Sequence, residues 1–209
     1  RNTLRYLLGA LNGFEDDEKI TFSKMPELEQ WVLHRVSELS KKIAENTEKF
    51  NLHDIYLDIH NFCTVDLSAF YFDIRKDTLY CEDLKGLERK SCRTVMDILF
   101  KSLTTWLAPI LCFTAEEAWQ SRQADINQSV HLRSYDPVPV DWHNDAIAAK
   151  WAEIRKARQV VMSALEAARN DGRIGASLQA APMVYISADM QAAFAGQDAA
   201  SLFITSCAT

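Results

Sequence analysis

The stretch PELEQWVLHRVSELSKKIAENT, residues 26–47, decides the fold class of this chain of 209 residues. Its apolar side chains recur three and four positions apart, which is the spacing that keeps them on one face of an α-helix. Pro26 fits the first turn of a helix, and Glu27 and Glu29 would lie near the positive end of the helix dipole. The stretch therefore predicts one long amphipathic helix.

The same helical spacing dominates the first 170 residues. Further helices are predicted at residues 4–11, 53–75, 86–107, 114–120 and 144–170. The helix at 114–120 is predicted because Thr114 and Glu117 have the spacing of a capping box. Residues 121–144 lack the pattern and predict an extended loop. Short connections between several helices favour an antiparallel helix bundle.

The composition changes after Asp171-Gly172, which is typical of the end of a helix. The runs MVYIS (183–187) and LFITS (202–206) are rich in β-forming residues and predict two short strands. Two strands of about five residues are not stable alone in water, so they suggest the start of a larger module. We therefore predict a mainly α fold, an antiparallel helix bundle over residues 1–175 followed by a small, truncated α+β segment over residues 176–209.

Net charge restricts the kinds of partner that this surface can bind. The chain has a net charge of −6 and a pI near 5.4, whereas proteins that grip nucleic acid with their whole surface carry a broad excess of Lys and Arg. Bases exceed acids only locally, by seven to five in residues 75–101 and by six to three in residues 150–173. An anionic partner must therefore bind locally, and the simpler explanation of each cluster is a solvated helix face.

The sequence contains no pattern typical of an enzyme active site. It lacks a P-loop, GxGxxG, GxSxG and HExxH, and its five cysteines form no CxxC pair, so no metal site or redox dithiol is predicted. His60 and Cys63 lie three residues apart on one predicted helix, where a structural pair is favoured over a nucleophile. No apolar run reaches the length of about 18 residues that spans a membrane, and the cysteines suit a reducing compartment such as the cytoplasm.

The segment LSAFYFDIRKDTLY, residues 67–80, combines aromatic and charged side chains in a way that a folding core alone does not require. Phe70 and Phe72 are two residues apart and cannot share one helical face. We expect at least one of Phe70, Tyr71 and Phe72 to point away from the core, with Tyr71 half-buried against a neighbouring helix. The segment is therefore either a helix with one inward and one outward face, or a binding surface.

Motifs spread along the chain occur in an order that resembles one known family. They are RNTLRYLLGALNGF (1–14), FYFDIRKDTLY (70–80), RKSCRTV (89–95), LAPILCFTAEEAW (107–119) and ARQVVMSALEAARNDGRIGASLQA (157–180). Together they closely resemble the anticodon-binding domain of the isoleucyl-tRNA synthetases, a family of class I aminoacyl-tRNA synthetases, over nearly the whole chain. Gln179 stands where this family usually has Glu, so this position carries an amide in place of the carboxylate.

The resemblance implies a tRNA-binding function without catalysis by this stretch of chain. The family ligates isoleucine to tRNA with ATP, but its HIGH-type and KMSKS signatures, its editing domain and its cysteine-rich zinc module are absent from the sequence. ATP, Mg and a structural Zn are therefore expected only in other parts of the parent enzyme. The expected partners are isoleucine tRNA and the catalytic and editing domains of the same chain, with no DNA and no membrane, and the parent is expected to be a cytoplasmic monomer.

In such a bundle, the charged end of one helix and the start of the next would face the anticodon loop. The residues expected to contact RNA are Arg75, Lys76, Tyr80, Arg89, Lys90 and Arg93. An aromatic ring or a guanidinium plane would stack on an unpaired base, and the other cations would position the phosphates. Arg1 and Arg5 are expected at the junction with the catalytic domain or on the tRNA stem.

Other interpretations of the same residues stay open at this point. In a helical protein-interaction module, the aromatic side chains would dock a partner helix instead of RNA. The valyl relatives share the pattern of LAPILCFTAEEAW, although they are expected to differ within residues 1–14. The bases would otherwise form solvated ion pairs of little energetic value, Arg75 with Asp73 or Asp77, and Arg89 with Glu88 or Asp97.

Overall fold

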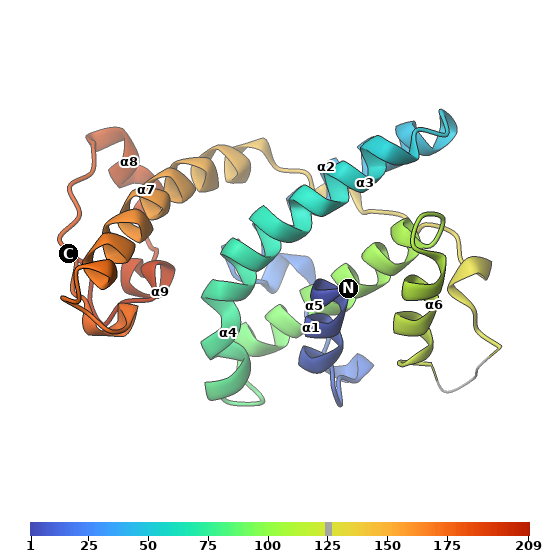
Figure 1. Ribbon diagram of the computed structural model, residues 1–209, viewed down its shortest axis with the longest axis horizontal. Coiled ribbons are helices and arrows are strands. Elements are labelled where there is room, and N and C mark those ends of the chain that lie inside the picture. The colour runs from blue at the N-terminus through green and yellow to red at the C-terminus, as the bar shows by residue number, and fades with distance from the viewer. Residues whose placement is uncertain (124–126) are drawn as a thin grey trace. The chain divides into compact units, whose positions relative to one another are not determined.

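The computed structural model describes residues 1–123 and 127–209, so part of the predicted loop, residues 124–126, lies outside the described residues. The described chain divides into two compact units, residues 1–144 and residues 145–209. The regular elements of both units are helical, and no β-strand is assigned among the described residues (Figure 1). The prediction of a mainly α fold is confirmed.

The first unit contains most of the predicted helices. They are α1 (Asn2–Ala10), α2 (Glu27–Glu48), α3 (Leu52–Asn61), α4 (Phe72–Cys81), α5 (Leu87–Leu107) and α6 (Cys112–Gln120). A π-helical segment, Phe62–Tyr71, joins α3 to α4 without a break in the helical backbone. Short 3₁₀ turns lie at Asp16–Glu18, Phe22–Lys24, Val130–Leu132 and Val140–Trp142. The helices predicted from residues 26–47 and 86–107 are confirmed as α2 and α5.

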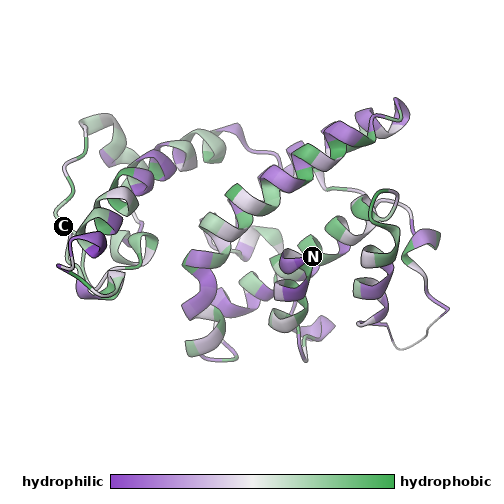
Figure 2. Ribbon diagram, viewed as in Figure 1, coloured by the Kyte–Doolittle hydropathy of each residue, from purple (hydrophilic) through white to green (hydrophobic). Residues whose placement is uncertain are grey.

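The central element of the first unit is α5, which contacts α1, α2, α4 and α6 (Figure 1). Fifteen of its 21 residues are buried, so side chains on nearly all of its faces pack against neighbours. Its buried hydroxyls bond to the helix backbone, for example Thr104 Oγ1 to the carbonyl oxygen of Phe100 at 2.7 Å, which satisfies them inside the core. Figure 2 shows hydrophobic and hydrophilic residues mixed along the helices that surround α5, as amphipathic helices require.

Three consecutive aromatic residues, at the junction between the π-helical segment and α4, pack in different directions. Phe70 lies edge-on against Trp31 of α2, with 5.2 Å between the ring centroids. Phe72 stacks on Tyr6 of α1, with 4.5 Å between the centroids, and Tyr71 between them is fully buried. The expectation that one of the three points away from the core is wrong, because neighbouring helices cover this stretch on more than one side.

The start of α6 also differs from the prediction. The helix begins at Cys112, so Thr114 lies within its first turn and does not occupy the predicted capping position. The carboxylate of Glu116 instead accepts a hydrogen bond from the backbone N–H of Val130 at 2.9 Å. The hydrogen bond from the Gln120 amide, followed by that from Val130, holds the pKa of Glu116 below its ordinary value. Glu116 therefore fixes the 3₁₀ turn at Val130–Leu132 on α6.

The second unit consists of α7 (Asp145–Asn170), a 3₁₀ turn (Ser177–Gln179), α8 (Ala188–Phe194) and α9 (Ala199–Phe203). The predicted helix 144–170 is confirmed as α7, and Gly172 adopts the left-handed conformation (φ +71°) that ends a helix. Both short helices contact α7. Arg158 of α7 is buried and donates from Nε to the carbonyl oxygen of Leu202 at 2.8 Å, which holds α9 in place.

The predicted strand LFITS is wrong. Its first two residues, Leu202 and Phe203, are the end of α9, and the left-handed Ile204 (φ 55°) stops that helix. Leu202 and Phe203 are almost completely buried in the second unit. Burial of these side chains in a helical position outweighs the local preference for a strand, which is a weak determinant by itself.

The predicted strand MVYIS, residues 183–187, does not form either. The chain before α8 is extended, and Val184 N–H donates to the carbonyl oxygen of Thr209 at 2.7 Å, while Thr209 N–H donates to that of Pro182 at 3.2 Å. These two bonds hold Thr209 against this segment, although no β-strand forms there among the described residues. The α+β description of residues 176–209 is therefore corrected to short helices and extended chain.

Cysteine exposure provides a first test of this fold. Cys81, Cys112 and Cys207 are exposed, Cys63 is partly buried and Cys92 is fully buried in α5. Burial raises the pKa of Cys92 to about 12 and that of Cys63 to about 11. Because the thiolate is the reactive form, both thiols should react slowly near neutral pH.

We expect iodoacetamide to label the three exposed cysteines first and Cys92 last, as measured by mass spectrometry of the digested protein over time. Labelling in denaturant is the control, since all five thiols should then react at similar rates. Reaction of Cys92 in the folded protein at the rate of Cys81 would contradict the packing of α5.

Candidate nucleic-acid interface

The end of α4, the connection that follows it and the start of α5 form one corner of the first unit, residues 76–90, which we name the α4–α5 corner. The two helices contact each other, and the connection between them is tight. Gly86 N–H donates to the carbonyl oxygen of Asp83 at 2.9 Å, and a Cβ atom on Gly86 would lie only 3.1 Å from that oxygen. The chain therefore turns directly from the end of α4 into α5.

Large apolar side chains of this corner are exposed to solvent. Tyr80 is 72% exposed, Leu84 66% and Leu87 51%. The cations of the corner, all exposed or half-buried, are Lys76, Lys85, Arg89 and Lys90. Four exposed acids, Asp77, Glu82, Asp83 and Glu88, equal these cations in number, so the corner has no net positive charge. It nevertheless combines an exposed aromatic ring, which can stack on a base, with individual cations that can contact phosphates.

Arg89 is anchored to the end of α4. Its Nε donates to the carbonyl oxygen of Leu79 at 3.1 Å, where the negative end of the helix dipole favours a cation. This bond holds the guanidinium group at the turn of helix that carries Tyr80. Lys76, one turn earlier, pairs with Asp73 at 3.3 Å, and such a partly exposed pair is weak enough for an anion to compete with it.

Arg75 has a different environment from the rest of the predicted RNA contacts. It is buried, and its Nε and Nη2 donate to the two carboxylate oxygens of Glu29 at 2.7 Å each, while Nη1 donates to Glu88 at 3.2 Å. The hydroxyl of Tyr71 donates to the same Glu29 carboxylate at 3.1 Å. Arg75 therefore links α4 to α2 and α5, and contact between Arg75 and RNA stays a prediction.

The electrostatics of this buried network favour its charged form. Burial by itself would lower the pKa of Arg75, but the adjacent Glu29 carboxylate more than compensates and raises it above the ordinary value. Burial, with a smaller effect from Cys92, raises the pKa of Tyr71, so its hydroxyl keeps the proton that it donates to Glu29. The network thus holds a carboxylate, a guanidinium and a neutral phenol in fixed positions beneath the α4–α5 corner.

Arg93 is likewise engaged within the protein. Its Nη1 donates to the Glu18 carboxylate at 2.7 and 2.9 Å, and its Nη2 to the carbonyl oxygen of Asn12 at 2.8 Å. Its Nε donates to the carbonyl oxygen of Ala10 at 3.2 Å, and the guanidinium lies over the ring of Phe14, 5.2 Å from its centroid. Arg93 therefore fixes the end of α1 on α5, and its contact with RNA also stays a prediction.

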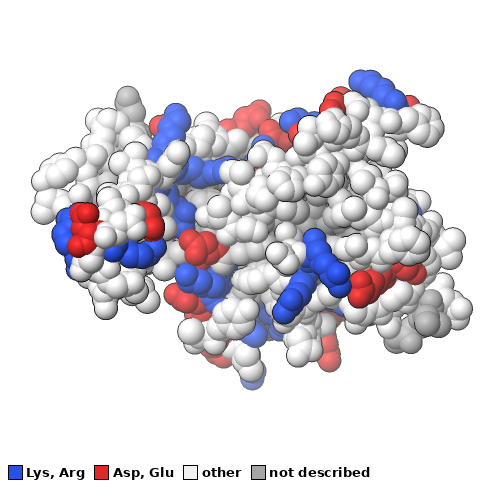
Figure 3. Space-filling view, viewed as in Figure 1, with Lys and Arg blue, Asp and Glu red and all other residues white. Residues whose placement is uncertain are grey.

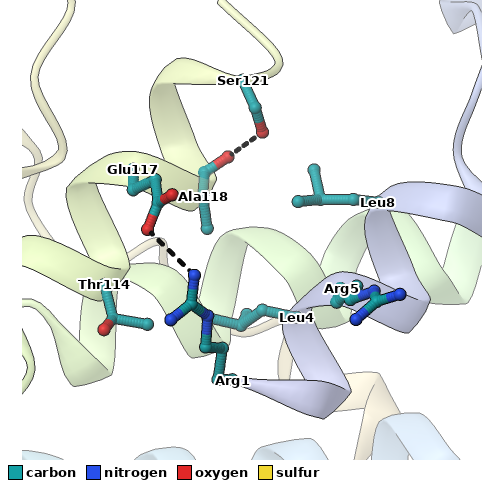
Figure 4. Close-up of a pocket in the computed structure, with 8 residues that line it drawn as sticks. All are labelled: Arg1, Leu4, Arg5, Leu8, Thr114, Glu117, Ala118 and Ser121. Atoms are coloured by element: carbon teal, nitrogen blue, oxygen red, sulfur yellow. Dashed lines mark hydrogen bonds and ion pairs between the residues drawn. The ribbon is translucent and has the colours of Figure 1, made fainter.

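Arg1 and Arg5 lie away from this corner, on α1. They line a cavity of about 240 Å³ between α1 and α6 (Figure 4). Arg1 Nη2 lies 3.9 Å from a carboxylate oxygen of Glu117, and both side chains are largely exposed. The two arginines that the sequence suggested for a junction or a tRNA stem are therefore brought to one site on the first unit.

No metal centre emerges from the described side chains, since in residues 1–123 and 127–209 no group of three or more His, Cys, Asp or Glu residues is placed to hold an ion. In the same residues, no helix is both long enough and apolar enough to cross a membrane. Acidic and basic side chains are interspersed on the face drawn in Figure 3, so that face carries no broad basic surface. Binding of an anion therefore depends on local sites.

Comparison with known proteins identifies the class of this fold. Residues 29–185 match the family described as the anticodon-binding domain of tRNA ligase. The chain belongs to this family, and the matched range contains the whole α4–α5 corner.

Within that class, the chain is similar over its full length to isoleucine-tRNA ligases. It is 50% identical to the isoleucine-tRNA ligase of Agrobacterium fabrum over the whole chain, and 46% identical to that of Gluconobacter oxydans over 99% of the chain. It is 45% identical to that of Caulobacter vibrioides, again over the whole chain. The chain spans only 21–22% of the length of these relatives, so it corresponds to their anticodon-binding part. The resemblance seen in the motifs is confirmed.

Proposed function

We infer that this chain is the part of an isoleucine-tRNA ligase that binds the anticodon region of isoleucine tRNA. The observation that carries the proposal is the unbroken similarity of the chain to isoleucine-tRNA ligases, together with the match of residues 29–185 to an anticodon-binding domain. The geometry adds an exposed aromatic ring, Tyr80, in a corner that also carries four cations and an equal number of acids. The α4–α5 corner is therefore the surface that we propose for contact with the anticodon loop.

In the proposed complex, different residues of the α4–α5 corner contact the bases and the phosphates of the anticodon loop. The ring of Tyr80 stacks on one unpaired base, and Lys76, Arg89 and Lys90 contact the phosphates around it. The hydrogen bonds from buried Arg75 to Glu29 and Glu88 fix α4 against α2 and α5, and thereby hold Tyr80 in position for contact with the RNA. Of the six residues predicted as RNA contacts, we thus propose four for contact and two, Arg75 and Arg93, for positioning.

The test of this proposal is the substitution Tyr80→Ala. One lost base stack weakens binding by about 1–3 kcal/mol, which is roughly 5- to 150-fold in Kd. Fluorescence anisotropy with a labelled anticodon stem-loop of isoleucine tRNA measures the change, and the same stem with a permuted anticodon reports discrimination. The proposal predicts that Tyr80→Ala loses affinity and that Tyr80→Phe, which keeps the ring, retains most of it.

A matched control exists in the second unit, where Tyr185 is 88% exposed. Tyr185→Ala removes an equally accessible ring outside the α4–α5 corner and should leave binding unchanged. Equal affinity of the wild-type protein for both loops would contradict anticodon recognition by this chain. A loss with Tyr185→Ala but none with Tyr80→Ala would place the interface elsewhere.

We propose that the parent enzyme, and not this stretch alone, ligates isoleucine to tRNA. Binding of ATP, Mg and a structural Zn would then belong to the remaining four-fifths or so of the chain length seen in the relatives, as would contacts to catalytic and editing domains. A cytoplasmic monomer is part of the same proposal. Isoleucine-dependent pyrophosphate exchange catalysed by residues 1–209 alone would overturn it.

We also propose a division into an anticodon-binding bundle, residues 1–175, and a separate module, residues 176–209. The end of α7 at Asn170 and the left-handed Gly172 support a boundary there, although the second compact unit begins earlier, at Asp145. Limited proteolysis distinguishes the two boundaries. First cleavage near Gly172 favours the proposed division, and first cleavage near Asp145 argues against it.

A further inference from the structure

The cavity between α1 and α6 is lined by apolar side chains and by two arginines, Arg1 and Arg5. Its apolar floor is formed by Leu4 and Leu8, and its rim carries Arg1 and Arg5 from α1 and Thr114 and Glu117 from α6 (Figure 4). At about 240 Å³ it is smaller than the pockets of roughly 300–1,000 Å³ that enclose small-molecule ligands. An open site of this size suits a single charged group carried by a larger molecule.

The cations of the rim are available for such a group. Among the described residues, no ion pair is found for the exposed Arg5, whose guanidinium lies on the α1 side of the cavity in Figure 4. Arg1 pairs with Glu117 at 3.9 Å, and the two side chains are 80% and 72% exposed. An ion pair of this length and exposure contributes little to stability, so an incoming anion can displace it.

We propose that this cavity binds a phosphate group of an RNA sugar-phosphate backbone. Arg5 is the main donor, because its planar guanidinium offers two parallel N–H groups to phosphate oxygens. Arg1 and the hydroxyl of Thr114 complete the site, and Glu117 is the counter-ion that leaves Arg1 when the phosphate arrives. The proposal rests on the proposed function, since it adds a second RNA contact to the α4–α5 corner.

The choice of phosphate over a protein carboxylate follows from the site itself. Glu117 already presents a carboxylate at 3.9 Å from Arg1, and that pair is long and exposed, so the rim does not hold a single carboxylate tightly. A phosphodiester offers two non-bridging oxygens, each of which can accept hydrogen bonds from a guanidinium group. A backbone contact of this kind adds affinity without reading bases.

The experiment compares Arg5→Ala, Glu117→Gln and the control Lys41→Ala, which removes an exposed cation of α2 outside both surfaces. Each variant is titrated with the isoleucine anticodon stem-loop and with the permuted stem-loop across a salt series. We expect Arg5→Ala to weaken binding of both RNAs about 10-fold and to reduce the slope of log K against log salt by about 1. Glu117→Gln should tighten binding of both RNAs, and Lys41→Ala should change neither quantity.

The outcomes separate this proposal from the proposed function. If Arg5→Ala leaves affinity and salt slope unchanged while the wild-type protein still prefers the correct loop, the cavity proposal is overturned and the anticodon function stands. If the wild-type protein binds neither RNA, the proposed function itself fails. Arg5→Lys keeps the positive charge and should restore the salt slope if the site contacts a phosphate. The melting temperatures of Arg5→Ala and Arg5→Lys, compared with that of the wild-type protein, show whether misfolding causes any loss of binding. Loss of poly-glutamate binding, but not of RNA binding, in Arg5→Ala would show that the occupant is an acidic protein and would also overturn the proposal.

Discussion

Replacing Glu29 by Ala is expected to lower the free energy of unfolding by about 3–5 kcal/mol, which is the cost of leaving a buried charge without its partner. Glu29 is completely buried, Arg75 is 8% exposed, and two hydrogen bonds of 2.7 Å join them. The substitution also removes the acceptor of the buried Tyr71 hydroxyl. Urea unfolding followed by circular dichroism measures the change.

Two further variants show whether the buried charge causes this loss. Glu45→Ala removes an exposed carboxylate from the same helix, α2, and should change stability by less than about 0.5 kcal/mol. Replacing both partners, Glu29→Leu with Arg75→Met, should recover much of the lost stability, because no unpaired charge then remains. A loss below about 1 kcal/mol with Glu29→Ala would mean that water reaches Arg75 and that the network does not hold α4 in place.

Arg93→Ala is expected to lower the free energy of unfolding by about 3 kcal/mol, with the effect concentrated in the N-terminal segment. The side chain joins α5 to the Glu18 carboxylate and to the carbonyl oxygens of Ala10 and Asn12. The loss should be smaller than with Glu29→Ala because the Glu18 side chain is 17% exposed and can regain water. Without Arg93, α1 loses its main polar anchor on α5.

Hydrogen exchange detects this local effect. In Arg93→Ala the amides of α1 should exchange faster relative to those of α2, whereas a uniform loss would accelerate both helices alike. The control is Arg173→Ala, which removes an exposed arginine paired only with the exposed Asp171 among the described contacts. Unchanged protection of α1 in Arg93→Ala would contradict the anchoring role.

Periodicity predicted the long helices because their pattern is local. The apolar side chains of α2 and α5 repeat along a single helix, and the structure confirms both. Partners across the fold were not predicted, since Glu29 and Arg75 are 46 residues apart and the sequence suggested the neighbours Asp73 and Asp77 instead. One signal was present in the sequence: Glu29 shares the face of α2 that also carries Val32, Leu33 and Val36, where an acid is out of place.

The sequence predicted that the end of one helix and the start of the next lie together, which the structure confirms for α4 and α5, but it did not predict which of their side chains are buried. The short connection after α4 necessarily brings Tyr80 close to the start of α5 in the fold, so sequence proximity sufficed. Burial of Arg75 and Arg93 depends on packing against α1 and α2, which no local pattern encodes. The same limit explains the false strand at 202–206, where burial of Phe203 determines the helical conformation.

The most direct test of the central claim, that the α4–α5 corner receives the anticodon loop, is amide chemical-shift mapping by NMR. An isoleucine anticodon stem-loop is added to the isotope-labelled protein, and shifts are compared with those caused by the permuted loop. The account predicts that shifts specific to the correct loop concentrate in residues 76–90. Specific shifts that leave this corner unperturbed and concentrate in another part of the chain, such as residues 183–187, would contradict it.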